Sequence, residues 1–406
     1  MQILYFGTVC DIENYEKFII HSKRKPSMAP IVFETSLLTG FKELDCNVDI
    51  YSFPMIPNFT QSRILSWGSR EEFLSCGYVN KWIPTINLPF LKQISRFFNS
   101  RRIIKKWINA HNDEDCAVII YSVCPYIAPN IINLCNKYNI KCFSIIADLP
   151  KNMFINKKQG KFKTMISNFY LKPAVKYQSR FDGYVFLTEH MKNVIGSDAL
   201  YTVVEGIVCN QEKNNSKQRI NKYSKKAIMY AGGLNEKYGI ENLIKAFLKI
   251  NREDCELWLF GDGNFVDKIK LYASKNSLIK FFGRVNHDEI LEYEKKATLL
   301  VNVRNVDDEY TKYSFPSKTI EYMLSGTPVL TTKLPGIPKE YYNYLYMIEN
   351  NSIDEISFAL TRILDLNCDI LTEFGINAKN FILDNKNASI QSEKVLKLID
   401  KVKQEG

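Results

Sequence analysis

The chain has 406 residues, of which 46% are hydrophobic and 24% are charged, and its formal net charge is +10. This composition excludes a disordered or collagen-like chain, and the length favours two domains over one. The positive charge suits an anionic partner such as a nucleotide, a phospholipid surface or a nucleic acid. The ten cysteines form no C-x-x-C pair, so we expect reduced thiols in a cytoplasmic protein rather than disulfides or zinc ligands.

In the first half of the chain, strand-like and helical patterns alternate. The sequence begins as a strand, without the pattern of a signal peptide. The strand-like runs are 2–6, 48–53, 117–123, 141–147 and 183–187. Helical patterns lie between them, for example at 31–44 and 94–109. The uncharged stretch 117–136 contains Pro125 and Pro129, so we interpret it as a strand, a loop and a helix rather than a membrane span.

A second alternating series follows the polar segment 210–226, which we interpret as an interdomain linker. Its strand-like runs are 227–230, 256–260, 279–282, 298–303 and 345–347. Its helical patterns are 240–250, 265–274 and 287–297, and the last part of the chain, 356–403, is helical. Both halves therefore predict doubly wound α/β domains with mostly parallel sheets, and we expect ligands in a cleft at the carboxyl ends of the strands.

The segment 315–330, FPSKTIEYMLSGTPVL, predicts a tight turn, a short helix, a glycine stop and a buried strand. Its turn offers backbone N–H groups, the Ser317 hydroxyl and the Lys318 ammonium, which suit a phosphate or diphosphate. Glu321 comes three residues after Lys318, on roughly the same face of the helix. A carboxylate there can accept hydrogen bonds from ribose or sugar hydroxyls. The alternative is a capped surface helix with a solvated Glu321.

Three other strand-like runs of the second half end in small-residue turns. The first is followed by Gly232, Gly233 and Lys237, and its pattern is neither G-x-G-x-x-G nor a Walker A loop. The next two end at Gly261 and at Gly283. Each turn alone is weak evidence, but parallel strands bring all of them to one edge of one sheet.

Together these motifs resemble the nucleotide-binding domain of the family-4 retaining glycosyltransferases, of the bacterial polysaccharide-biosynthesis type. The matching runs are 230–239, 259–263, 281–285, 315–330 and 336–340. The first half matches by architecture, most clearly at 182–188 and 204–208. The resemblance implies the GT-B fold, with two Rossmann-like domains facing a cleft. Residues 1–210 would bind the acceptor, 211–380 the nucleotide sugar, and 381–406 would form a helix that returns to the first domain.

The resemblance implies a hexosyltransferase-type enzyme that uses a UDP- or GDP-sugar, retains the anomeric configuration and needs no metal cofactor. Glu321 would bind the donor ribose, Ser317, Lys318 and Thr319 would face the diphosphate, and Lys237 would neutralise it as it leaves. Fixed cations and backbone dipoles can stabilise that leaving group. The other donor-binding candidates are Gly232, Gly233, Gly261, Gly283, Arg284, Val285, Tyr313, Phe315 and Pro316.

Three positions depart from the family pattern. Tyr313 stands where the family often has a first glutamate, and the acids at 307–309 are possible substitutes. Gly233 stands where an arginine is common, so Arg304 is the candidate second cation beside Lys237. In place of a histidine after the fourth strand of the first domain, the chain has Asp148. We expect Asp148 to act as a base or to orient the acceptor hydroxyl, with a simple turn role before a proline as the alternative.

No metal site is predicted. The four histidines show no metal-ligand spacing. The D-x-D pattern at 113–115 precedes its strand, and we interpret it as a solvated loop.

Two stretches, 91–108 and 151–180, are rich in Lys and Arg interleaved with apolar residues and contain no acid. Such patterns favour contact with an anionic membrane, although a helix with a solvated basic face is the alternative. No nucleic-acid-binding module is present. The resemblance further implies a cytoplasmic enzyme at the inner face of the cell membrane, acting on a lipid-linked saccharide in capsule, exopolysaccharide or O-antigen synthesis. A nucleotide-sugar 2-epimerase and a non-catalytic sugar-nucleotide-binding subunit remain open.

Overall fold

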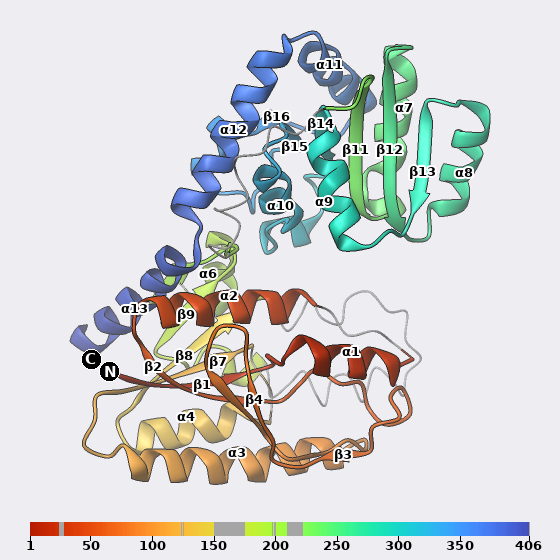
Figure 1. The fold of residues 1–406 in the computed structure, drawn as a ribbon. Coiled ribbons are helices and arrows are strands. Elements are labelled where there is room, and N and C mark those ends of the chain that lie inside the picture. The colour runs from red at the N-terminus through yellow and green to blue at the C-terminus, as the bar shows by residue number, and fades with distance from the viewer. Residues whose placement is uncertain are drawn as a thin grey trace. The chain divides into compact units, whose positions relative to one another are not determined.

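The computed structural model describes residues 1–23, 28–122, 124, 126–149, 175–196, 198, 200–208 and 222–405. The chain forms two compact units (Figure 1). The first unit consists of Met1–Cys209 together with Asn387–Gly406, and the second of Asn210–Lys386.

The first unit is built on a mixed sheet with the strand order β10-β9-β8-β7-β1-β2-β5-β4. Every neighbouring pair is parallel except β4 with β5. Its strands are β1 (Gln2–Gly7), β2 (Asn47–Ser52), β4 (Glu71–Phe73), β5 (Val79–Trp82), β7 (Cys116–Tyr121), β8 (Lys141–Ile146), β9 (Gly183–Phe186) and β10 (Tyr201–Val203). A small separate sheet pairs β3 (Ser66–Trp67) with β6 (Thr85–Ile86).

Helices cover both faces of this sheet, with α2 and α13 on one face and α3 and α4 on the other (Figure 1). The central strands are therefore continuous apolar runs, because both of their faces are buried. The helical segments are α1 (Ile12–Ile20), α2 (Ala29–Glu43), α3 (Leu91–Ala110), α4 (Ala128–Lys137), η1 (Glu189–Met191), α6 (Lys192–Ile195) and α13 (Ala388–Glu405).

The C-terminal helix α13 belongs to the first unit because it packs closely on α2. A Cβ atom at Gly40 would lie 2.1 Å from the carbonyl oxygen of Ala388, so only glycine allows this approach. The Ser392 hydroxyl donates a hydrogen bond of 2.8 Å to the Leu37 carbonyl. The chain re-enters the first unit at 386/387 rather than at 380/381, because α12 runs unbroken through residue 381 to Asn385.

The second unit has an all-parallel sheet in the order β13-β12-β11-β14-β15-β16. The strands are β11 (Lys226–Gly233), β12 (Cys255–Asp262), β13 (Ile279–Gly283), β14 (Leu299–Asn302), β15 (Val329–Thr332) and β16 (Tyr346–Ile348). The segments between and after them are η3 (Glu236–Tyr238), α7 (Ile240–Ile250), α8 (Val266–Lys275), α9 (His287–Lys296), η4 (Glu309–Lys312), α10 (Lys318–Leu324), η5 (Lys339–Tyr344), α11 (Ile353–Leu364) and α12 (Cys368–Asn385).

This strand order is that of the Rossmann fold, with the first and fourth strands of the unit, β11 and β14, side by side at the centre. The connections on the two sides of this point run in opposite directions. Ligands of such sheets bind at this switch point, outside the carboxyl ends of the two strands.

The predicted strands and helices are confirmed. The structure adds β4, β5 and β10 to the sheet of the first unit, as well as the short pair of β3 and β6, none of which was predicted from the sequence. The stretch 117–136 forms β7, a loop and α4 as expected, and no helix in the described residues is long and apolar enough to cross a membrane. The cysteines among the described residues are free thiols. Most of the expected linker, 210–221, lies outside the described residues.

Candidate functional site

Two of the expected cations meet at the switch point of the second unit. Lys237 follows β11 on η3, and Arg304 follows β14. Both lie against the ring of Tyr238, with Lys237 Nζ 5.1 Å and the Arg304 guanidinium carbon 5.3 Å from its centroid. Lys237 also lies 5.5 Å from the ring centroid of Tyr310. Cations are attracted to aromatic faces at these distances, so the two tyrosines hold both side chains in one place.

Several polar groups of this cluster lack an ion-pair or hydrogen-bond partner within the described part of the protein. Within the described residues, neither Lys237 nor Arg304 forms an ion pair with a carboxylate. Arg304 Nε and the Tyr310 hydroxyl are buried and have no hydrogen-bond partner there. Buried polar groups are nearly always paired in native proteins, so an anion with several oxygen acceptors would complete this arrangement.

The turn, short helix, glycine stop and strand expected at 315–330 are present as the turn before α10, α10 itself, Gly326 with φ +74°, and β15. On α10, Lys318 forms an ion pair with Glu321, and the two side chains are about a quarter to a third exposed. Lys318 Nζ also lies 3.7 Å from Oε1 of Glu294, a fully buried residue of α9. Lys318 and Glu321 therefore lie on the same face of the helix, as expected, and a second carboxyl group lies beside them.

At the carboxyl ends of β11 and β12, the backbones of the two strands approach each other closely. Gly232 pairs with Gly261 in the parallel register. Gly261 has φ +126°, and a Cβ atom there would lie 1.9 Å from the Gly232 carbonyl oxygen. Neighbouring Gly233 is exposed. These residues leave backbone, rather than side chains, at the rim that faces the switch point.

On the β13 side of the rim, Gly283 takes a left-handed conformation with φ +69°. Arg284 forms an exposed ion pair with Asp262, at 3.4 Å between Nε and Oδ2. Val285 is half-buried. This part of the rim remains the predicted place for the base.

Several of the other predicted donor-binding residues pack inside the second unit. Phe315 is buried, with its ring centroid 5.4 Å from that of Tyr341. Pro316 is also buried, and Thr319 is fully buried with a hydroxyl that lacks a partner in the described residues. Ser317 is exposed, and Tyr313 is half-buried at the end of η4. Only Ser317, of these five, presents its side chain freely to solvent.

In the first unit, Asp148 follows β8 at the carboxyl edge of the sheet, as expected. Its side chain reaches solvent, yet partial desolvation raises the pKa of its carboxyl group above the ordinary value. A carboxylate with a raised pKa is suited to proton transfer.

A buried glutamate that no sequence pattern indicated lies close to the end of β1. Glu34, on α2, accepts hydrogen bonds from the Thr8 backbone N–H at 2.9 Å, the Thr8 hydroxyl and the Tyr5 hydroxyl at 3.0 Å. Burial raises the pKa of Glu34 to about 7, although these hydrogen bonds lower it. The group fixes the turn that leaves β1.

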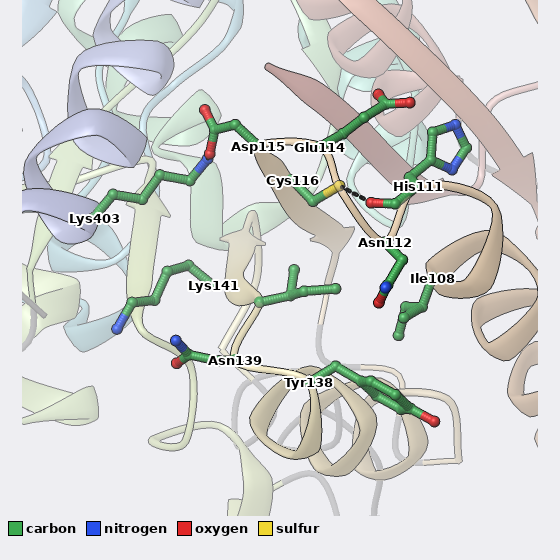
Figure 2. Close-up of a pocket in the computed structure, with 11 residues that line it drawn as sticks. Ile108, His111, Asn112, Glu114, Asp115, Cys116, Tyr138, Asn139, Lys141 and Lys403 are labelled. Carbon is green, nitrogen blue, oxygen red and sulfur yellow. Dashed lines mark hydrogen bonds and ion pairs between the residues drawn. The ribbon is translucent and has the colours of Figure 1, made fainter.

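A cavity of about 320 Å³ lies at the opposite edge of this sheet, where β7 and β8 begin (Figure 2). Lys403 of α13 reaches Asp115 across one side of it. The D-x-D pattern at 113–115 directly precedes β7, as expected. It therefore lies at the amino end of the strands, away from the carboxyl edge where ligands of such sheets bind. Among the described residues, no group of three or more His, Cys, Asp or Glu could hold a metal ion.

The basic stretch 91–108 forms most of α3, but two of its cations are not on a solvated face. Lys92 and Arg96 are buried, with Lys92 Nζ donating to the Ile56 carbonyl and Arg96 to the Pro54 carbonyl at 3.3 Å. Of the stretch 151–180, residues 151–174 lie outside the described residues.

Comparison with known proteins agrees with this architecture. Residues 211–381 match the family model of "Glycosyl transferases group 1". No curated protein matches the sequence. Among solved structures, the sucrose-phosphate synthase of Thermosynechococcus elongatus is similar over 100% of both chains, with 11% identity and a TM-score of 0.63.

Two further structures are similar over nearly the whole chain. The HepE protein of Anabaena, in complex with UDP, shares 14% identity over 99% of this chain and 100% of its own, with a TM-score of 0.60. The lipopolysaccharide outer core galactosyltransferase WaaB, in its apo form, shares 13% identity over 99% of both chains, with a TM-score of 0.61. The fold is GT-B, built from two Rossmann-like units, as the sequence resemblance implied. The family match and this fold support glycosyl transfer from a nucleotide sugar.

Proposed function

We propose that this protein is a retaining, metal-independent hexosyltransferase that moves a sugar from a UDP- or GDP-sugar to the hydroxyl group of an acceptor. The observation that carries the proposal is that Lys237 and Arg304 lie together at the switch point of the second unit without a carboxylate partner in the described residues. In addition, Arg304 Nε and the Tyr310 hydroxyl lack hydrogen-bond partners in those residues. A diphosphate supplies the charge and the acceptor oxygens that this place lacks.

In this proposal each group meets a different part of the donor. Lys237 and Arg304 stabilise the negative charge that develops on the departing diphosphate, without the need for a metal ion. Glu321 accepts hydrogen bonds from the ribose hydroxyls, and Lys318 and Ser317 lie toward the diphosphate. Asp148, in the first unit, accepts a proton from the acceptor hydroxyl or orients that hydroxyl.

The binding step is tested by thermal-shift and calorimetric titration with UDP, GDP and ADP and with their sugars. A ligand at about 100 times its Kd stabilises a protein by roughly 2.7 kcal/mol, which such a screen detects readily. We expect one uridine or guanosine ligand to stabilise the protein and Lys237→Ala to weaken its binding at least about 10-fold, the scale of one lost charged hydrogen bond. Lys245→Ala is the matched control, because Lys245 forms only an exposed pair with Glu241 on α7. No stabilisation by any nucleotide, or equal affinity in the Lys237 and Lys245 variants, would contradict the proposal.

The acceptor is proposed to be a lipid-linked saccharide of a bacterial surface polysaccharide, met at the inner face of the cell membrane. WaaB, which has the same fold, is by its description a lipopolysaccharide outer core galactosyltransferase. On α3, Ile94 and Phe98 are 51% and 63% exposed, and the exposed cations Arg101, Arg102 and Lys105 follow on the same helix. An exposed apolar turn followed by cations is the pattern of a helix that lies on an anionic membrane.

Vesicle flotation tests the membrane contact. We expect the protein to float with vesicles that contain phosphatidylglycerol at low salt, and to remain unbound with phosphatidylcholine alone. The double variant Arg101→Glu/Arg102→Glu should not float, whereas Lys268→Glu/Lys270→Glu, on α8 of the second unit, should float like the wild type. Absence of flotation of the wild-type protein, or equal flotation of both double variants, would refute the assignment of α3.

Product analysis separates the proposal from the two other functions that the sequence leaves open. A transferase releases nucleoside diphosphate only as glycosylated acceptor appears. A 2-epimerase would release nucleotide and an epimerised sugar without any acceptor. A binding subunit would bind the donor without turnover, and Asp148→Ala would then change nothing.

A further inference from the structure

A buried carboxyl group lies against the pair formed by Lys318 and Glu321. Glu294, on α9, has no exposed side-chain surface, and Lys318 Nζ lies 3.7 Å from its Oε1. The Glu321 side chain is 25% exposed and is paired with the same ammonium group. One cation therefore faces two carboxyl groups, of which one is open to solvent and the other is enclosed.

The surroundings of Glu294 favour its neutral form. Neither of its carboxyl oxygens has a hydrogen-bond partner in the described residues. An ionised carboxylate without hydrogen-bond donors is costly to bury, and two carboxylates that share one cation repel each other. In agreement, burial and then the charge of Glu321 raise the pKa of Glu294 well above its ordinary value, while Lys318 opposes this shift.

The other groups around Glu294 are engaged elsewhere. The Tyr322 hydroxyl, also on α10, accepts from the Ala231 N–H at 2.8 Å and donates to the Ala231 carbonyl at 3.1 Å. Thr327 donates at 2.8 Å to the backbone carbonyl of Glu294 and accepts at 2.7 Å from Lys222. Within the described residues, Lys318 is thus the one cation that pairs with the Glu294 carboxyl group.

We propose that Glu294 is a positioning residue of the donor site. It keeps its proton, so that Lys318 stays with Glu321 and no negative charge beyond that of Glu321 faces the diphosphate. This inference rests on the proposed function, because it assigns Glu321 and Lys318 to the nucleotide diphosphate. Loss of the Glu294 proton draws Lys318 toward α9, away from Glu321, and repels the anionic ligand. Donor affinity therefore falls with rising pH through ionisation of a residue that never touches the donor.

Calorimetric titration with UDP and with GDP, at about pH 7 and about pH 9.5, tests this coupling on the full-length protein. The wild-type protein is compared with Glu294→Gln, which cannot ionise, and with Glu292→Gln, an exposed residue of the same helix. Titration of the nucleotide itself contributes equally to all three proteins. Circular dichroism at both pH values shows that each is folded.

We expect the wild type and the Glu292→Gln variant to lose about 10-fold in affinity between the two pH values, the scale of one charged hydrogen bond. The Glu294→Gln variant should lose at most about 3-fold in affinity over the same pH change. The same loss in all three proteins would overturn the positioning role and leave the proposed function standing. Absence of UDP and GDP binding at either pH would overturn the proposed function and the role together.

A second measurement needs no nucleotide. In protein labelled with ¹³C at the glutamate carboxyl carbons, one resonance should titrate above neutral pH and be missing from Glu294→Gln. Titration of that resonance together with the ordinary glutamates, at about pH 4.3, would overturn the inference even if UDP binds.

Discussion

Lys237 Nζ lies 5.5 Å from the ring centroid of Tyr310, and the hydroxyl of that ring is buried without a hydrogen-bond partner in the described residues. The relationship predicts opposite effects of Tyr310→Phe on binding and on stability. The variant loses a donor to the ligand, so nucleotide affinity should fall about 10-fold. It also loses a buried unpaired hydroxyl, so the Tm of the unliganded protein should stay equal or rise. Calorimetry and a thermal melt of the same sample check both effects, and unchanged affinity would remove Tyr310 from the site.

Glu321→Ala should weaken donor binding or turnover at least about 10-fold, because a charged hydrogen-bond acceptor for the ribose is lost. The pair of Lys318 with Glu321 is partly solvated, and such a pair adds little to stability, so the variant should remain folded. Glu355→Ala, at the start of α11, is a control for general loss of a carboxylate. A folded Glu321→Ala variant with wild-type donor kinetics would end the assignment.

Chelation should leave transferase activity intact. In the proposed mechanism, Lys237 and Arg304 stabilise the leaving diphosphate, so no divalent ion is needed for this step. The initial rate is measured with and without EDTA, and again after Mg²⁺ or Mn²⁺ is restored. A rate that EDTA abolishes and Mg²⁺ or Mn²⁺ restores would show that the mechanism uses a metal.

The fold was predictable from local pattern because the periodicity and the turn signals agree. The expected helix 240–250 is α7 with the same bounds. Its amphipathic run begins directly after the turn that contains Gly239 and ends before Asn251, which has a left-handed backbone conformation. The glycine turns were placed at one edge because parallel strands all end there. This rule brought Lys237 and Arg304 together without any knowledge of distance.

The features that sequence reasoning missed depend on tertiary contacts. Glu294 stands in a run of acids and lysines that are otherwise at least partly exposed, and only the packing of α9 beside α10 encloses it. Lys92 and Arg96 belong to a basic run that suggests a solvated face, yet carbonyl groups after β2 accept their hydrogen bonds. Tyr310 sits in a polar loop with no repeating pattern. A signal for Glu294 was nevertheless present, because it stands four residues after the buried Ile290 of its helix and three before the buried Ala297 that follows the helix.

Gly261→Ala should destabilise the second unit strongly. The substitution places a Cβ atom 1.9 Å from the Gly232 carbonyl oxygen and forces alanine to adopt φ +126°. The cost should be roughly 2–4 kcal/mol, from the left-handed backbone and from overpacking. Gly68→Ala is the control, because a Cβ there meets nothing within 4 Å. Urea denaturation compares the two, and equal unfolding free energies would contradict the close approach of β11 and β12.

The buried Glu34 predicts a pH dependence of stability in the first unit. Its pKa in the folded protein is raised to about 7 from 4.5, so between these values the folded state binds more protons than the unfolded state. The unfolding free energy therefore falls as pH rises from about 4.5 to about 7, by about 3 kcal/mol at 1.36 kcal/mol per pKa unit, and stays lowered above that range.

The Glu34→Gln variant tests this dependence, because Gln keeps the shape but cannot ionise. Relative to the wild type, it should gain about 3 kcal/mol of unfolding free energy on going from about pH 5 to about pH 8. The exposed Glu16→Gln on α1 should follow the wild type at both values. Urea unfolding monitored by a tryptophan signal of the first unit, such as Trp82 or Trp107, measures the difference. A Glu34→Gln curve parallel to that of the wild type would mean that Glu34 is ionised throughout this range, held so by the Thr8 and Tyr5 hydrogen bonds.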